Sequence, residues 1–235
     1  MRFFKIFMLT AALLLTSAAQ AAERKFSLFS FDDIRISNGV DVVLTSGKGP
    51  SARAEGETRE LLDRVSLQKN GKQLIVSIRP KSLSGDDYDG DAPVTLFLSS
   101  YAISNITHLG SGLVTLDKLS GRTPRARLGG FGTLRIDAVD ADRLDVVMTG
   151  GGQVILAGTA RDARVELQGA SMFESPGLTV EKLTLVQRGP ASSQMKVMRE
   201  ANITNNGTGR IAIAGKPNCT VRTDGAADIV CNPDR

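Results

Sequence analysis

Apolar residues recur around a series of evenly spaced glycines between residues 103 and 231. An apolar side chain lies four residues before each glycine, and another lies four residues after it, except at Ser193. Alternate residues on both flanks are mostly apolar, which is the period of a β-strand with one buried face. The glycines lie 20, 20, 19, 20, 18 and 18 residues apart, at Gly110, Gly130, Gly150, Gly169, Gly189, Gly207 and Gly225.

A fixed repeat near 20 residues predicts an all-β fold, a right-handed parallel β-solenoid (β-helix) of about seven short coils over residues 101–235. Neighbouring coils would pair through their backbones, and equivalent apolar residues would stack in inner columns. Glycine at each repeated corner would permit a positive φ. The two columns are Ile106, Ala126, Val146, Val165, Leu185, Ile203 and Val221, and Val114, Leu134, Val154, Phe173, Ser193, Ile211 and Ile229.

Residues 22–100 lack the glycine period and are predicted to form a β-rich N-terminal portion. Apolar alternation on both sides of Asn38-Gly39 indicates strand, turn and strand. Good helix formers over residues 57–63 favour a single helical turn. Two apolar runs around Asn70-Gly71 predict a hairpin, for which we expect a type I′ turn with positive φ at both central residues.

Residues 1–21 have the pattern of a cleaved signal peptide. Arg2 and Lys5 precede an apolar run from Ile6 to Leu15, and Ala19-Gln20-Ala21 is a small-x-small cleavage site before Ala22. The run is about half the roughly 20 residues that a membrane-spanning helix needs. We therefore expect an exported protein, periplasmic or secreted, that is not an integral membrane protein.

Composition narrows the class of ligand. The formal net charge is +4, and removal of Arg2 and Lys5 with the leader leaves +2, so the basic character gives little support to nucleic-acid binding. The chain has no tryptophan and two tyrosines, which disfavours an aromatic platform for carbohydrate. Its 24 glycines suit repeated turns.

The only two cysteines, Cys219 and Cys231, each lie six residues from Gly225 and should point into the last coil. In an oxidising compartment they are expected to form a disulfide. Closing a loop of about 13 residues contributes on the order of 3 kcal/mol in the loop-entropy model. A pair of buried thiols is the alternative. Facing β-layers lie about 10 Å apart, so the last coil must narrow or fold back for the bond to form.

The order of these motifs resembles the putative autotransporter-adhesin "head GIN" domain family. The resemblance rests on Phe31 to Val42, on the Leu-Ile-Val-x-Ile strand of the hairpin, on serial Gly-x-Gly turns and on Ile-Ala-Gly-Lys-Pro at 213–217. It covers about residues 30–231 and implies an exported bacterial β-helix-like protein of undefined biochemical role. Four residues follow Cys231, too few, we expect, for the membrane barrel of a self-transporting protein.

A catalytic site is not predicted. The single histidine, His108, lies in a mixed column two residues before Gly110 and is interpreted as a structural, hydrogen-bonded side chain. A β-helix polysaccharide lyase would use clustered acids and an arginine or lysine base. Candidates for those roles are Asp117, Asp137, Asp140, Asp142 and Asp145, with Arg122, Arg125, Arg127 and Arg135. These residues fall at turns and outward strand positions, where charge is expected in any case.

Two polar clusters remain as candidate binding sites. Asp86, Asp87, Asp89 and Asp91 are weak calcium candidates, because Ala92 and Leu98 stand where an EF-hand needs glycine and glutamate; a solvated acidic loop is the preferred interpretation. Arg122, Arg125, Arg127 and Arg135 are possible contacts for an anionic polymer, the alternative being an ordinary solvated face. No metal site and no cofactor are predicted.

Taken together, these patterns favour an exported, non-catalytic envelope protein, an adhesin-like binding or scaffold module. Its partner would be an unidentified envelope polysaccharide or protein. The first alternative is a polysaccharide-processing enzyme that acts on a lateral face of the β-helix. A further alternative is a periplasmic partner-binding or stress-related accessory protein.

Overall fold

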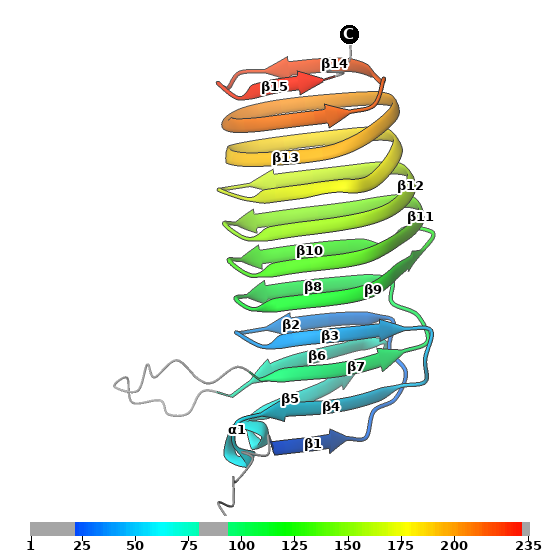
Figure 1. Ribbon diagram of the computed structural model, residues 1–235, viewed down its shortest axis with the longest axis vertical. Coiled ribbons are helices and arrows are strands. Elements are labelled where there is room, and N and C mark those ends of the chain that lie inside the picture. The colour runs from blue at the N-terminus through cyan, green and yellow to red at the C-terminus, as the bar shows by residue number, and fades with distance from the viewer. Residues whose placement is uncertain (1–21, 80–93, 232–235) are drawn as a thin grey trace, which may run out of the picture.

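A single sheet winds into a rod-shaped β-solenoid in the computed structural model, which describes residues 22–79 and 94–231 (Figure 1). Of the residues that the structure describes, 76% are strand and about 3% helix, and the solenoid has about six turns, against about seven predicted coils. The sheet contains 15 strands. The predicted fold class is confirmed, while the leader at residues 1–21 lies outside the described residues.

One long side of the rod, here called face A, stacks parallel strands in register. From the N-terminal end it contains β2 (Asp33–Ser37), β8 (Asn105–Gly110), β10 (Arg125–Gly130) and the second half of β11 (Thr133–Gly150). It continues through the matching parts of β12 (Gln153–Gln168) and β13 (Met172–Ala214) to β14 (Asn218–Thr223).

The opposite long side, face B, is reached by the chain after each glycine corner. It contains β3 (Asp41–Ser46), β9 (Leu113–Gly121), the first halves of β11 and β12, alternate segments of β13, and β15 (Asp228–Cys231). Below β3 it is extended by β7 (Thr95–Ser100), β4 (Ser51–Gly56) and β1 (Ala22–Phe26), of which β4 and β1 run antiparallel to their neighbours.

The predicted inner columns are the core of the rod. In the first column, the residues from Ile106 to Ile203 are all buried, and those from Ile106 to Leu185 pair with one another across neighbouring coils. In the second column, the residues from Val114 to Ile211 are buried, including Phe173 and Ser193. Val221 and Ile229, the last members, are more exposed because no described coil lies above them.

The glycine corners require glycine for two different reasons. Gly110, Gly130, Gly150, Gly169 and Gly189 have positive φ, as predicted. Gly207 and Gly225 do not, so the expectation of positive φ was wrong there. A Cβ atom at either position would still collide with the carbonyl oxygen of the glycine one coil below, so close stacking of the corners excludes any side chain.

The N-terminal portion joins the solenoid directly. β2 and β3 pair in parallel with β8 and β9, so the strands around Asn38-Gly39 form a coil of the rod. The hairpin of β5 (Val65–Asn70) and β6 (Gln73–Ile78) is present. Its turn type was predicted wrongly: Asn70 pairs with Gln73, and only Gly71 of the two central residues has positive φ, as in a type II′ turn.

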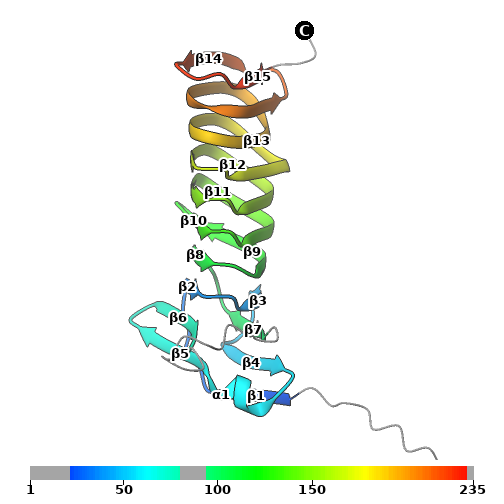
Figure 2. The ribbon, with the colours of Figure 1, turned by 90° about the vertical axis from the view of Figure 1, so that its left-hand side faces the viewer.

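The short predicted helix, α1 (Arg59–Asp63), closes the N-terminal end of the core. It begins at the N-cap Thr58, whose hydroxyl accepts a hydrogen bond from the backbone N–H of Leu61 at 3.2 Å. Leu61 and Leu62 are buried on its inner side, and α1 packs against β1, β4 and β5 (Figure 2).

The disulfide between Cys219 and Cys231 is present, with the two Cα atoms 6.5 Å apart. The last coil does not fold back as a hairpin, since β14 and β15 both run parallel to β13. Cys219 follows the corner at Gly215–Pro217 by two residues, and Cys231 pairs with Ile213, two residues before that corner. Both cysteines therefore lie beside the corner at which faces A and B converge.

Candidate functional site

Five arginines project from the lower half of face A. Arg35 on β2 and Arg127 on β10 lie in one outward column, with Thr107 of β8 between them. Arg125 lies in the neighbouring column above Asn105. Arg122 precedes β10 at the edge of the face, and Arg143 follows one coil above it, with its backbone N–H bonded to the Arg122 carbonyl. We call Arg35, Arg122, Arg125, Arg127 and Arg143 the basic face.

The strands fix the spacing of this basic face. Adjacent strands lie about 4.8 Å apart, so the Cα atoms of Arg35 and Arg127, two strands apart, are separated by about 10 Å along the rod. Arg125 and Arg127 are two residues apart on one strand, or about 7 Å. Buried neighbours such as Ile34, Ile36 and Ala126 hold the backbone beneath them. The cations therefore form a two-dimensional array on a rigid surface.

Few carboxylates neutralise the basic face. Arg125 Nε lies 3.7 Å from Asp145 Oδ2 on the next coil. Within the described ranges 22–79 and 94–231, Arg35, Arg122, Arg127 and Arg143 form no ion pair. One coil further up, Arg164 is paired with Glu166, whose hydrogen bond raises the pKa of the guanidinium. Positive charge is thus in excess on the lower part of face A.

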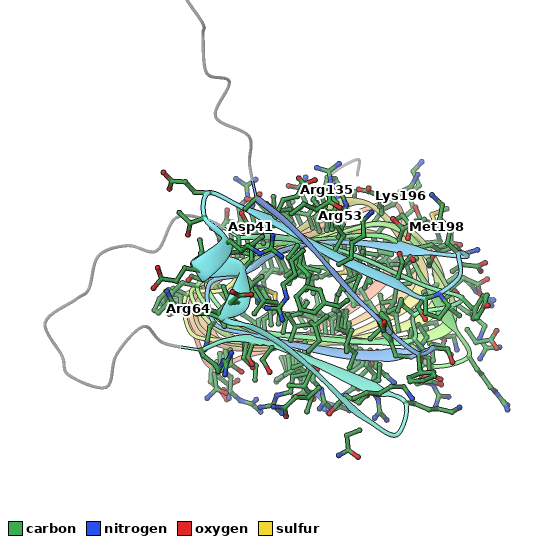
Figure 3. All side chains as sticks on the ribbon, turned by 90° about the horizontal axis from the view of Figure 1, so that it is seen from below. Asp41, Arg53, Arg64, Arg135, Lys196 and Met198 are labelled. Atoms are coloured by element: carbon green, nitrogen blue, oxygen red, sulfur yellow. A yellow bond between two sulfur atoms is a disulfide. The ribbon has the colours of Figure 1, made fainter. Side chains whose placement is uncertain are left out.

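The four arginines that the sequence analysis grouped do not all lie on the same face of the rod. Arg122, Arg125 and Arg127 belong to the basic face, whereas Arg135 projects from face B and is paired with Asp137 at 2.8 Å. Viewed along the rod, Arg135 lies on the same flank as Arg53 and Lys196 (Figure 3). Sequence reasoning missed Arg35 as a member of the array. The sequence indicated that Arg35 points outward, because it lies between two isoleucines that are buried. It did not indicate that β2 stacks under β8, which is a long-range contact.

The fold does not bring the candidate acids of a lyase site into one group: Asp117 and Asp137 lie on neighbouring coils of face B, whereas Asp145 lies on the other face. Asp117 accepts hydrogen bonds from the backbone N–H groups of Ser46 and Lys118, each at 2.7 Å. Asp140 is paired with Lys118 at 3.2 Å, at a corner of the rod, and Asp145 lies on face A. Among the residues that the structure describes, no three His, Cys, Asp or Glu side chains are grouped so that they could hold a metal ion. The lyase alternative is not favoured.

His108 is a structural residue inside the rod. Its side chain is fully buried, and Nε2 lies 3.2 Å from the carbonyl oxygen of Gly112. Burial lowers the pKa of the imidazole, against the opposing effects of that hydrogen bond and of Asp41. Nδ1 is buried and has no hydrogen-bond partner among the described residues. Higher in the same column, Gln187 donates a hydrogen bond to the Ala191 carbonyl at 2.8 Å.

A shallow open depression lies beside β1 and β4 and is lined by Phe26, Leu28, Pro50 and Arg53 among others. The Arg53 guanidinium stacks on the ring of Phe97, 4.5 Å from its centroid, and is paired with Glu23 and Glu55. Because Arg53 and the neighbouring Lys25 are both paired with carboxylates, this depression offers no free cation to an anionic ligand. The acidic residues Asp86, Asp87, Asp89 and Asp91 lie outside the described residues.

The described part of the chain contains no helix that is long and apolar enough to cross a membrane. A family model described as "Putative auto-transporter adhesin, head GIN domain" matches residues 30–217. A comparison with curated proteins gives no match.

Three solved structures of similar fold illustrate the architecture. A putative adhesin from Bacteroides fragilis is 18% identical with a TM-score of 0.73, over 90% of this chain and 97% of that one. A putative adhesin from Parabacteroides distasonis is 12% identical with a TM-score of 0.65, over 91% and 98%. A putative lipid binding protein from Parabacteroides distasonis is 13% identical with a TM-score of 0.62, over 91% and 98%.

Proposed function

This chain belongs to the head GIN domain family of putative auto-transporter adhesins, and from that premise we propose that it is a non-catalytic, adhesin-like binding module of the bacterial envelope. It is exported through residues 1–21 and holds an anionic envelope polymer against the basic face of its solenoid. The ligand class is a polysaccharide with acidic substituents.

The observation that carries the proposal is the array of arginines on the lower part of face A, four of them without a carboxylate partner in the described residues. An exposed ion pair contributes little by itself. Several such contacts to one chain add, because binding of the first acidic group raises the local concentration of the next. An extended polymer can use the array in this way, whereas a single small anion cannot.

The shape of the site also supports binding without chemistry. Face A is a regular sheet surface, and its arginines are held on strands whose inner side chains are buried. The one histidine is inside the core, and four of the five candidate acids, Asp117, Asp137, Asp140 and Asp145, take part in ion pairs or backbone hydrogen bonds. A polymer lying on this surface would meet cations at intervals of about 5 to 10 Å.

Binding to immobilised dextran sulfate tests the proposal, with neutral dextran as the reference ligand. We expect the triple substitution Arg35→Gln, Arg125→Gln and Arg127→Gln to weaken binding at least about 10-fold, and the affinity to fall steeply with added salt. Arg135→Gln on face B is the matched control and should change the affinity less than about twofold.

Equal losses for both variants, or equal binding of the neutral polymer, would overturn the assignment to the basic face. Vesicles of phosphatidylcholine with and without phosphatidylglycerol distinguish the polymer from a lipid surface. Stronger binding to the anionic vesicles than to the sulfated polymer would replace the polysaccharide with a membrane. N-terminal sequencing of the exported protein, which should begin at Ala22, tests the export step.

A further inference from the structure

The last coil of the rod pairs with other strands on one side only. In the ranges 22–79 and 94–231, β14 and β15 each hydrogen-bond to β13 alone (Figure 1). Their outer edges present the alternating N–H and C=O groups of an unpaired strand. Such an edge is a template for another strand unless charge, proline or a covering element blocks it.

The apolar core is also left uncovered at the last coil. Val221 lies directly over Ile203 and Ile229 over Ile211, so both continue the inner columns. Val221 is nevertheless 41% exposed, whereas Ile203 is 1% exposed. The inward positions of this coil carry no charge, since they are occupied by Cys219, Val221, Thr223, Ile229 and Cys231. An inward lysine, the usual block to edge pairing, is therefore missing.

The disulfide holds the two strands of the last coil in place before a partner binds. It joins the start of β14 to the end of β15 and so ties the two exposed edges to each other. Both strands are already ordered on β13 before any partner arrives. The conformational cost of adding a further layer is reduced accordingly.

The other end of the molecule does not fit this coil. There, α1 inserts Leu61 and Leu62 into the core, and the antiparallel pairs β1–β4 and β5–β6 diverge on either side of it (Figure 2). Head-to-tail stacking would place this helix against the edges of β14 and β15. The end that does match the last coil is the last coil of a second copy, because it presents the same two strand edges.

We propose that two copies of this chain pair through their last coils, end to end, about a two-fold axis near Val221 and Ile229. Each strand then lies antiparallel to its own copy. Val221 faces Val221 of the partner subunit, and Thr220 faces Arg222 of the partner subunit, so no two like charges are directly opposed. A contact of this type closes after two copies, giving one rod of double length.

Analytical ultracentrifugation of the exported, oxidised protein measures the pairing. The chain should sediment as a dimer, and Val221→Lys should raise the dimer dissociation constant at least about 100-fold, because it places a lysine inside the new core. Val43→Lys is the matched control: Val43 is 38% exposed on β3, far from the last coil, and its substitution should leave the dimer intact. A monomer up to on the order of 100 µM, or a dimer that tolerates Val221→Lys, overturns the proposal.

A symmetric cross-link decides the register even if Val221→Lys disturbs folding. Opposed residues of antiparallel strands have Cα atoms about 4.5 to 5.5 Å apart, within reach of a disulfide. Under mild oxidation, Val221→Cys should form a covalent dimer and Val43→Cys should not. Equal cross-linking of the two variants, or none at position 221, overturns the two-fold arrangement. The basic-face substitutions lie outside this contact, so this proposal and the proposed function fail separately.

Discussion

The imidazole ring of His108 reaches beneath Gly132 of the next coil, and a Cβ atom on Gly132 would clash with its Nε2. The same atom would stand 2.9 Å from the carbonyl oxygen of Gly112. The absence of a side chain at position 132 therefore lets the buried histidine and the backbone corner below it pack in one layer.

The first prediction follows from this contact. Gly132→Ala should lower the free energy of unfolding by about 1–3 kcal/mol, because neither the buried ring nor the carbonyl can move aside freely. Gly151→Ala is the control, since its Cβ would meet only the exposed ring of Phe131, at 3.0 Å, and should cost less than about 0.5 kcal/mol. Urea denaturation of both variants measures the difference. Equal midpoints would contradict the packing described.

A second prediction concerns pH. Burial lowers the pKa of His108 in the folded chain, so below the ordinary histidine pKa of about 6.5 the unfolded chain binds a proton that the folded chain does not. Protonation of His108 therefore does not affect the free energy of unfolding above that pH, and it lowers the free energy of unfolding as the pH falls below it. Chemical denaturation between pH 7.5 and 5 should show a decline that His108→Gln reduces. His108 is the only histidine of the chain, so an unchanged slope in the variant would refute its role.

The inner columns provide a third prediction. Val146→Asp or Val165→Asp would place an unpaired carboxylate between stacked coils and should cost several kcal/mol or prevent folding. Their outward neighbours serve as controls: Asp145→Ser and Glu166→Ser should change stability by about 0.5 kcal/mol or less. Thermal denaturation compares the four variants, and similar midpoints would show that the columns are assigned wrongly.

The disulfide leads to a fourth prediction, which hydrogen exchange can test. Paired Cys219→Ser and Cys231→Ser substitution should increase amide exchange after about Asn218, because β14 and β15 are held on one side only. Amides near Val146 should keep their protection. Exchange that rises evenly along all coils would show that the bond stabilises the whole rod.

The solenoid could be predicted because its strongest constraint is local. Each coil repeats the same alternation about one glycine, so Ile106, Val146 and Ile203 could be aligned without knowledge of the fold. The turn at Asn70-Gly71 was harder, because a shift of the loop by one residue exchanges a type I′ for a type II′ turn. Sequence alone does not fix that register.

The binding surface was predicted in part. Arg125 and Arg127 precede their glycine corner, and Arg135 follows it, so the repeat itself places Arg135 on the opposite face. Arg35 joins the array only because β2 stacks under β8, a contact between residues about 70 positions apart. Such long-range stacking depends on how the N-terminal portion docks, which no periodic pattern in that portion records.

Because the glycine corners stack in register, the length of the rod can change only by the gain or loss of whole coils. Each coil contacts only the coil above and the coil below, so duplication or loss of one repeat preserves every other interface. One such event moves the disulfide-tied end by about 4.8 Å relative to the arginines near the base. The distance between a ligand held low on the rod and whatever meets its tip can thus change by whole repeats while both surfaces stay the same.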